Sequence, residues 1–287
     1  MFVACPHLNS SLKMCHVVNK KRPAGIIVYT IENGGDGPMS IRRALPFVLK
    51  PPQRGTQGIL KRPQLIHRLD RPTSGLLVAG KTRSAVVNLA RQFEDRLVNK
   101  TYTAILNGIP KEDDEPHCMK DEMEGDTKKW NLIDHDLEDK NAVTFWRIVK
   151  QVSSFKAKEG YLSVVEMMPK TGRTHQLRRH MAWTKDTPIV GDPDYGGGDA
   201  LQLRGYGLFL CSNKLIVNHP YYNTVEGRSE WEKLPENSKW ADGMLQLSED
   251  GSTVQVHATI DIANKFTSFL RKIEAQQRYS GIGDEAN

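Results

Sequence analysis

The 287-residue chain is 38% hydrophobic and 26% charged, with a mean hydropathy of −0.52. This composition is that of an ordinary globular protein and excludes a fibrous or a disordered one. No apolar run approaches the about 20 residues that a membrane-spanning helix requires, and the N-terminus lacks the apolar segment of a secretory signal. We therefore expect an intracellular protein, cytoplasmic by default; an organelle stays open because the first sixteen residues contain no acid.

The cysteines are too few and too scattered for a disulfide framework, and none forms a C-x-x-C pair. No closely spaced set of soft ligands indicates a zinc site. We expect reduced thiols and no metal. The four cysteines are Cys5, Cys15, Cys118 and Cys211.

The net charge of +6 is unevenly distributed. Residues 111–140 hold twelve acids and five bases, a charge of −7, whereas the rest of the chain holds 35 bases and 22 acids, a charge of +13. Such a basic body attracts a polyanion, most simply a nucleic acid, in a salt-dependent way. A merely soluble basic protein fits the charge equally well.

The N-terminal part of the chain predicts short strands and basic loops. Residues 1–16 are typical of a frayed arm. A strand beginning at His16 leads to a basic tip at 20–25, and a second strand follows at 26–29. Residues 50–64 are rich in proline, glycine and cations, which predicts a basic loop.

A buried strand at 75–79 and a helix follow, and Thr82 or Ser84 can cap that helix. Residues 100–106 predict the next strand, which contains Tyr102. The apolar stripe of the helix consists of Ala85, Leu89, Phe93 and Leu97.

The remaining pattern does not alternate strands and helices strictly. This favours the α+β class, with a mixed, largely antiparallel sheet flanked by helices. The expected elements are a solvated acidic insertion at 111–140, strands at 142–152 and 161–168, a short helix at 174–184 packing through Leu177 and Met181, a loop at 192–198, a strand at 208–211 and a helix at 261–277.

One charged turn, His67-Arg68-Leu69-Asp70, runs directly into a buried strand. Asp70 is a single carboxylate among cations, which hold it ionised. This suits a nucleophile or an electrostatic stabiliser better than a general acid. On this segment alone, a turn-capping aspartate in a salt bridge is the more common arrangement.

A second segment, 171–180, places three arginines and two histidines at the start of a helix. The positive end of the helix dipole disfavours cations there, so an anion should compensate: a carboxylate, with Asp70 the obvious candidate, or a phosphate. Arg178 can point into a cleft while Leu177 packs. An exposed basic helix is the alternative. Tyr102, considered alone, is a packed aromatic residue.

Taken together and in this order, the motifs resemble the RluA-type RNA pseudouridine synthases over about residues 17–220. The motifs are His67-Arg68-Leu69-Asp70 with Thr73-Ser74-Gly75-Leu76-Leu77, Lys100-x-Tyr102-x-Ala104, Thr171-Gly172-Arg173-Thr174-His175-Gln176-Leu177-Arg178-x-His180, Gly191-Asp192-x-x-Tyr195-Gly196, and His219-Pro220.

The resemblance implies a pseudouridine synthase fold with a central active-site cleft, acting on uridine in ribosomal or transfer RNA. The base leaves C1′ of the ribose, rotates and is reattached through C5, with no metal or organic cofactor. Asp70 would be the catalytic aspartate, Tyr102 the residue against the uracil and the general base at C5, and Arg178 the basic partner of Asp70.

The resemblance also implies roles in RNA binding. Arg68 would fill the space left by the flipped-out uridine, and Arg173 and His175 would support the loop or the RNA backbone. Lys20 and Arg22, in the first basic loop, would contact phosphates.

For the domain organisation, we expect a single catalytic domain over 17–287 after the arm at 1–16. The residues before 17 leave no room for an N-terminal S4 RNA-binding domain, so substrate choice would rest on the catalytic domain, its loops or another molecule. A monomer is expected.

Two other functions compete with this one. A catalytically silent RNA-binding or ribosome-assembly factor on the same fold would also be basic. A hydrolytic glycosidase would need a second acid and would release free uracil.

Overall fold

The computed structural model describes residues 16–22, 45–47, 49, 52, 55–120, 125–196, 207–235 and 244–281. The chain divides into two compact units. The first unit comprises the described residues of 1–100 and 214–260, and the second those of 101–213 and 261–287. Two strands, β4 (Asn99–Asn107) and β9 (Leu210–Asn218), pass from one unit to the other along the chain.

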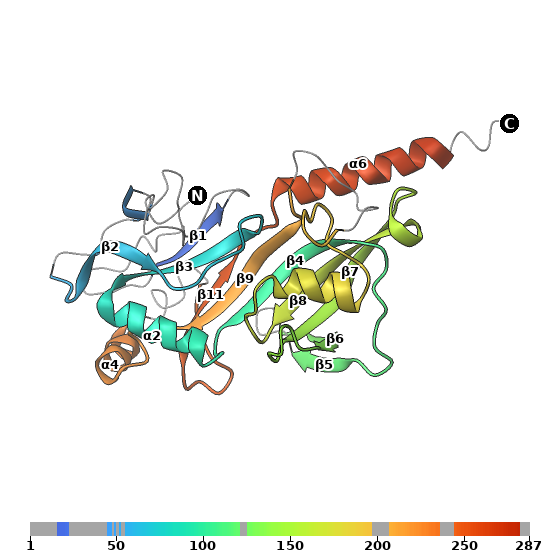
Figure 1. The fold of residues 1–287 in the computed structure, drawn as a ribbon. Helices are drawn as coiled ribbons and strands as arrows, with labels where there is room; N and C mark the ends of the chain where they lie inside the picture. The colour runs from blue at the N-terminus through green and yellow to red at the C-terminus, as the bar shows by residue number, and fades with distance from the viewer. Residues whose placement is uncertain are drawn as a thin grey trace. The chain divides into compact units, whose positions relative to one another are not determined.

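The first unit is built on antiparallel strands around β3 (Ser74–Thr82), which is buried along its whole length. Its other members are β1 (His16–Arg22), β2 (Ile59–Leu65), the last residues of β9, β11 (Val254–Thr259) and β10 (Leu245–Leu247). The helices α2 (Arg83–Glu94) and α4 (Val225–Lys233) also belong to this unit, and α2 packs against β3 (Figure 1).

The predicted start of α2 is confirmed, but its predicted end is not. Thr82 caps the helix, because its Oγ1 accepts a hydrogen bond from the backbone N–H of Ala85 at 3.3 Å. The helix ends at Glu94, and Arg96 adopts a positive φ of 60°. Leu97 therefore leaves the apolar face and is exposed.

Two predicted basic loops of this unit contain strands. Lys20 and Arg22 lie on β1, where Arg22 is aligned with Gly75 of β3. Part of the loop predicted at 50–64 forms β2, paired with β3. Pairing with a buried neighbour has outweighed the proline and glycine content of these segments. The strand predicted at 26–29 and the arm before residue 16 lie outside the described residues.

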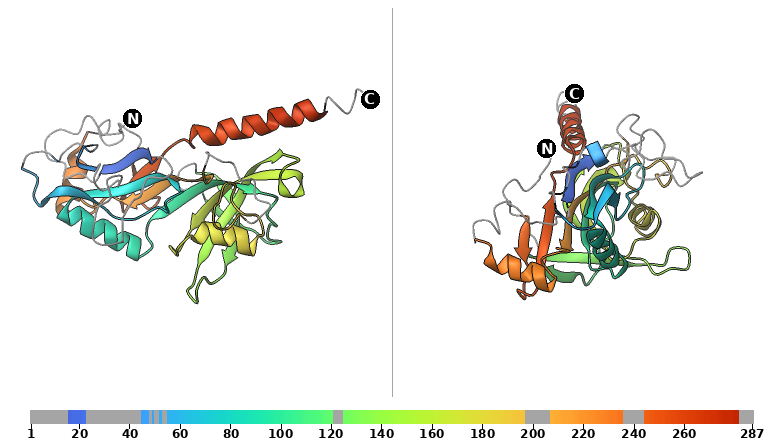
Figure 2. Two further views of the ribbon diagram at one scale, coloured as in Figure 1. Left: turned by 45° about the horizontal axis from the view of Figure 1, so that its top comes forward. Right: turned by 90° about the vertical axis from the view of Figure 1, so that its left-hand side faces the viewer.

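The second unit is an antiparallel sheet in the order β9, β4, β8, β7, β6, β5. The new strands are β5 (His117–Lys120), β6 (Thr127–Asp134), β7 (Val143–Ser153) and β8 (Tyr161–Pro169), and a 3-10 turn, η2 (Lys158–Gly160), precedes β8. The helix α6 (Asn264–Gly281) packs against β7, and the left view of Figure 2 shows it along its length. The predicted α+β class with a largely antiparallel sheet is confirmed.

The acidic segment 111–140 is more ordered than a solvated insertion. It contains β5 and β6, and it buries Trp130, Ile133 and Leu137. An acid takes part in the order: Asp113 Oδ2 accepts a hydrogen bond from the backbone N–H of Leu132 at 2.6 Å. The many charged residues of this segment obscured the strand β6, which buries apolar side chains.

The loop after β9 is organised by the buried side chain of His219. Its Nδ1 accepts hydrogen bonds from the backbone N–H groups of Tyr221 (3.3 Å) and Tyr222 (3.0 Å), and its ring stacks on Tyr222 at 4.3 Å. Tyr222 belongs to a small core with Trp231 and Val254. Burial lowers the pKa of His219 to about 3, so the ring is neutral in the folded protein.

We expect His219 to make the folded state sensitive to acid. The unfolded chain takes up this proton near pH 6.5 and the folded chain only near pH 3, so stability falls as the pH is lowered through this window, by at most about 1.4 kcal/mol per pH unit. In His219→Asn the amide oxygen can accept the same N–H groups without titrating. Urea unfolding at pH 7.5 and pH 4.5 should show a smaller loss of stability for the variant. Equal losses in the two proteins would contradict this.

Candidate active site

Asp70 lies in a tight turn of the first unit, immediately before β3. The turn is closed by a hydrogen bond from the backbone N–H of Thr73 to the carbonyl of Asp70, at 2.9 Å. Leu69 and Thr73 are buried and anchor the turn, whereas Asp70 is half-buried. The carboxylate is therefore held on a fixed backbone and still has access to solvent.

His67 fastens the same turn to the strand and the helix beside it. Its Nε2 accepts a hydrogen bond from the backbone N–H of Val78 on β3 at 3.0 Å, and its ring stacks on Phe93 of α2 with centroids 4.6 Å apart. Burial, and then the charge of Lys100, lower the pKa of His67 to about 3. A neutral ring with its one proton on Nδ1 is what an acceptor Nε2 requires, so His67 links the Asp70 turn to β3 and α2 as an uncharged imidazole.

Tyr102 lies on β4, opposite Met167 of β8, and is half-buried. Lys100, two residues earlier, has its ammonium 5.8 Å from the centroid of the Phe93 ring. The Lys-x-Tyr motif thus begins in the first unit and ends in the second.

The helix predicted at 174–184 is short and irregular. It consists of α3 (Gln176–Arg179) and a π-helical turn, η3 (His180–Thr184). Leu177 and Met181 are buried, as predicted. The arginines are not exposed, however: Arg178 and Arg179 are buried as well, which excludes the basic surface helix.

Gln176 fixes the start of this segment, because both the oxygen and the nitrogen of its side-chain amide form hydrogen bonds. Its Oε1 accepts hydrogen bonds from the Thr171 hydroxyl (2.7 Å) and the Arg173 backbone N–H (3.0 Å). Its Nε2 donates to the carbonyl of Val143 and to Thr144 Oγ1, both at 3.0 Å. A buried amide with every bond satisfied fixes the loop before α3.

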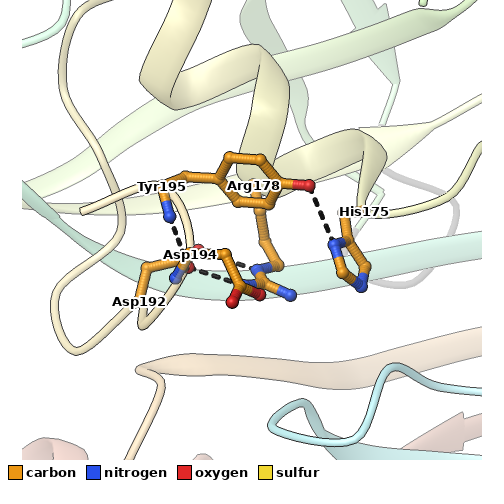
Figure 3. Close-up of polar contacts among 5 residues, drawn as sticks. All are labelled: His175, Arg178, Asp192, Asp194 and Tyr195. Atoms are coloured by element: carbon orange, nitrogen blue, oxygen red, sulfur yellow. Dashed lines mark hydrogen bonds and ion pairs between the residues drawn. The ribbon is translucent and has the colours of Figure 1, made fainter. Parts of the chain in front are cut away.

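Arg178 is held by two carboxylates of the following loop (Figure 3). Its Nε and Nη2 donate to Asp192 at 2.7 and 2.6 Å, and Nη2 also donates to Asp194 at 2.6 Å. Burial alone would lower the pKa of Arg178, but the two carboxylates outweigh it and raise the pKa. The guanidinium is permanently charged. Its remaining amino group, Nη1, is buried without a hydrogen-bond partner among the described residues.

Asp192 also shapes the loop that carries it. Its Oδ1 accepts hydrogen bonds from the backbone N–H groups of Asp194 (3.0 Å) and Tyr195 (3.1 Å). Gly191 before it has a φ of +75°, and a Cβ there would lie 2.4 Å from the carbonyl oxygen of Gly207. Only glycine fits this close approach, so residues 191–195 form one rigid support for Arg178.

Of the residues predicted to bind RNA, His175 and Arg173 lie on the loop before α3. His175 has a left-handed φ of 52°, and its Nδ1 is 2.9 Å from the Tyr195 hydroxyl (Figure 3). Arg173 donates its Nε to the carbonyl of Asn141 at 2.9 Å. In the first unit, Arg68 is exposed, two residues before Asp70.

The second unit brings Arg178, His175 and the 192–195 loop together. Asp70 lies in the first unit, whereas Tyr102 and Arg178 lie in the second, so the convergence of these three residues stays a prediction. Sequence reasoning did not assign roles to Asp192, Asp194 or Gln176. The available signal was the motif Gly191-Asp192-x-x-Tyr195-Gly196, which places an acid in the chain shortly after the arginine-rich segment 171–180.

A family model described as RNA pseudouridylate synthase matches residues 17–183, more than half of the chain. The chain belongs to this family. RNA pseudouridylate synthases isomerise uridine in RNA to pseudouridine, and the resemblance found in the motifs is confirmed. The matched range contains Asp70, Tyr102 and Arg178.

Individual RNA pseudouridylate synthases are similar over much of the chain. The tRNA pseudouridine synthase C of Vibrio vulnificus is 33% identical over 198 residues, 64% of this chain and 80% of that protein. The ribosomal large subunit pseudouridine synthase C of Rickettsia conorii is 34% identical over 160 residues, 55% of this chain and 50% of that protein. The chain thus spans about four fifths of the length of the first relative and about half of the length of the second.

The fold agrees with the family. The solved structure of human RNA pseudouridylate synthase domain containing 4 superposes with a TM-score of 0.55 over 92% of this chain and 91% of that one, at 20% sequence identity. Within the described residues, no group of histidine, cysteine and acidic side chains could hold a metal ion. No helix in the described ranges is both long and apolar enough to cross a membrane.

Proposed function

We propose that this RNA pseudouridylate synthase works through Asp70, Tyr102 and Arg178, without a cofactor, on a uridine of ribosomal or transfer RNA. In the reaction the N1–C1′ bond breaks, the retained uracil turns, the C5–C1′ bond forms, and the proton on C5 is replaced by one on N1. The family match over 17–183, which includes the three residues, carries the proposal.

Asp70 is the catalytic carboxylate in this proposal. Breaking the glycosidic bond creates positive character on the sugar, which an ionised carboxylate stabilises or traps. Its anchored turn supports the role, because a nucleophile or base acts from a fixed position. Attack at C1′, attack on the base and removal of a ribose proton are the three steps open to it.

Arg178 acts electrostatically in this proposal, as the basic group that keeps the Asp70 carboxylate ionised. Its raised pKa supports a cation that never gives up its proton. Its Nη1, buried and unsatisfied among the described residues, is the donor that remains to be paired after Asp192 and Asp194 have taken Nε and Nη2. Tyr102 lies against the uracil and removes the proton at C5.

Recognition of the RNA requires that the target uridine leave the base stack, at a cost of a few kcal/mol. Arg68, exposed and two residues before Asp70 in the chain, would fill the gap. Lys20, Arg22 and Arg173 would contact phosphates, and His175 would support the loop before α3. We further propose that the protein acts as a monomer in the cytoplasm, which gel filtration and localisation of the tagged protein would test.

The direct test is to incubate the purified protein with total RNA from cells that lack it, and to map pseudouridine at each position. New pseudouridine at defined positions, with no free uracil, is the expected result. Binding without new pseudouridine would indicate a silent RNA-binding or assembly factor. Release of uracil and abasic RNA would indicate a glycosidase. The mapped positions would also identify the RNA.

A further inference from the structure

We infer that Trp183 is a stacking site for an unpaired base of the substrate RNA, separate from the catalytic residues. This inference rests on the proposed function and adds a specificity-determining contact to it. The site lies wholly within the second unit, on the π-helical turn η3 that follows Arg178 and Arg179.

The exposure of Trp183 is the first observation. Among the described residues, Trp130, Trp146 and Trp231 are buried, whereas the side chain of Trp183 is 58% exposed. Burying a large aromatic side chain stabilises a folded protein, and at Trp183 most of that gain is absent. An exposed indole held in one position offers a flat apolar face, and tryptophan is enriched at binding interfaces for this reason.

The second observation is that Trp183 is held in place. The Arg179 guanidinium lies 4.6 Å from the centroid of its ring, and the Tyr195 ring meets it at 86° with centroids 5.5 Å apart. Arg179 in turn donates to Glu138 at 2.9 Å and to the carbonyl of Thr174 at 3.3 Å. A ring fixed in this way loses little conformational freedom on binding, which favours affinity.

The third observation is that further aromatic contacts connect Trp183 with Arg178 and His175. Tyr195 contacts His175 edge-on at 5.7 Å and through its hydroxyl, and the Arg178 guanidinium lies 4.9 Å from the centroid of the Tyr195 ring. Figure 3 shows the ring of Tyr195 beside the Arg178 side chain. Trp183 is thus connected to Arg178 through one aromatic neighbour, so a base on Trp183 would belong to the same stretch of RNA as the target uridine.

The backbone supports the same interpretation. The turn η3 is closed by a π-type bond from the backbone N–H of Lys185 to the carbonyl of His180, at 3.3 Å. Such wide turns occur frequently at functional sites. Met181 of this turn is buried while Trp183 faces solvent.

The chemistry favours a nucleobase. Proteins recognise unpaired bases in RNA by stacking them on aromatic side chains and guanidinium planes. Trp183 offers the first, and the cation–π contact with Arg179 holds its ring in place. Because every base has a π-face, the site would select an unpaired nucleotide more strongly than a particular base.

The experiment compares Trp183→Ala, Trp183→Phe and the wild-type protein on an RNA that the wild type modifies. Stacking of one base is worth about 1–3 kcal/mol, so the alanine variant should raise KM and the Kd for that RNA about tenfold, with kcat at saturating RNA unchanged. The phenylalanine variant should recover most of the affinity. Phe155→Ala is the matched control, since Phe155 is also in the second unit and 55% exposed, and it should leave KM unchanged.

A fluorescence measurement separates stacking from a structural role. The probe is the same RNA with 2-aminopurine at successive unpaired positions. At one position, the wild type and the phenylalanine variant should quench the probe and the alanine variant should not. Unchanged KM and quenching in Trp183→Ala, with an active wild type, would overturn the inference and leave Trp183 as a contact for a protein. A wild type that makes no pseudouridine would instead overturn the proposed function.

Discussion

Replacing Asp70 with asparagine should reduce pseudouridine formation by at least about a thousandfold while leaving the Kd for RNA within about twofold. Asparagine has the shape of aspartate but no charge, so it can neither trap the sugar nor act as a base. Losses of this size are typical when the reacting group of an enzyme is removed. Rates should be measured in single turnover at saturating RNA, and the Kd by filter binding at a stated salt concentration.

The fold of this variant should be intact, because asparagine keeps the shape of aspartate and leaves the backbone hydrogen bond from Thr73 N–H to the carbonyl of residue 70, which closes the turn, in place. Asp95→Asn is the control: Asp95 is exposed at the end of α2, in the same unit, and its replacement should change neither rate nor affinity. If Asp70→Asn kept more than about a tenth of the activity, another group would carry the chemistry. If it lost RNA binding as well, Asp70 would be a structural residue.

The second large effect is expected at Asp192. In Asp192→Asn the amide nitrogen or oxygen must face the Nε–H and Nη2–H groups of Arg178, and only one of the two atoms can accept. A buried cation then loses half of its compensation. Breaking a buried ion pair by removing one charge costs about 3–5 kcal/mol, so we expect a free energy of unfolding lower by about 3 kcal/mol, with the exposed Asp194 compensating in part. Activity should fall with it, because Arg178 loses its fixed orientation.

Two matched variants test whether the loss of stability in Asp192→Asn arises from the burial of its ion pair with Arg178. Asp194→Asn removes the second carboxylate of Arg178, which is 54% exposed, and should cost about 1 kcal/mol or less. Glu274→Gln breaks the exposed pair with Lys150, whose atoms are 2.7 Å apart, and should cost under about 1 kcal/mol with full activity. Urea unfolding measures all three. Equal losses for Asp192→Asn and Glu274→Gln would contradict the buried network as the support of Arg178.

Several parts of this protein could be predicted from local patterns. The strands β4, β7 and β8 contain many β-branched and aromatic residues, and β3 is centred on a short apolar run. Such segments are typical of half-buried or buried strands. The Thr82 cap needs only the three residues that follow it. Candidate active-site residues were found in the same way, because the motifs around Asp70, Tyr102 and Arg178 are continuous in the chain.

Other features depend on contacts between distant segments. The helix dipole predicted for 174–184 was the reason to expect an anion there. The helix α3 has only four residues, however. An anion is required because the Arg178 guanidinium is buried. The charge pattern of residues 111–140 predicted a solvated insertion, but strand pairing in this segment buries Trp130 and Ile133. Leu97 kept the helical spacing but lies beyond the end of α2.

The sequence by itself therefore determined the family, the candidate catalytic residues and most strands, because each depends on residues that are neighbours in the chain. Only the tertiary structure decided which carboxylates meet Arg178 and which aromatic ring is left exposed. A buried charge is stabilised by whatever group the folded chain brings within hydrogen-bond distance, and Asp192 reaches Arg178 only because the glycine at 191 allows the loop to turn back onto α3.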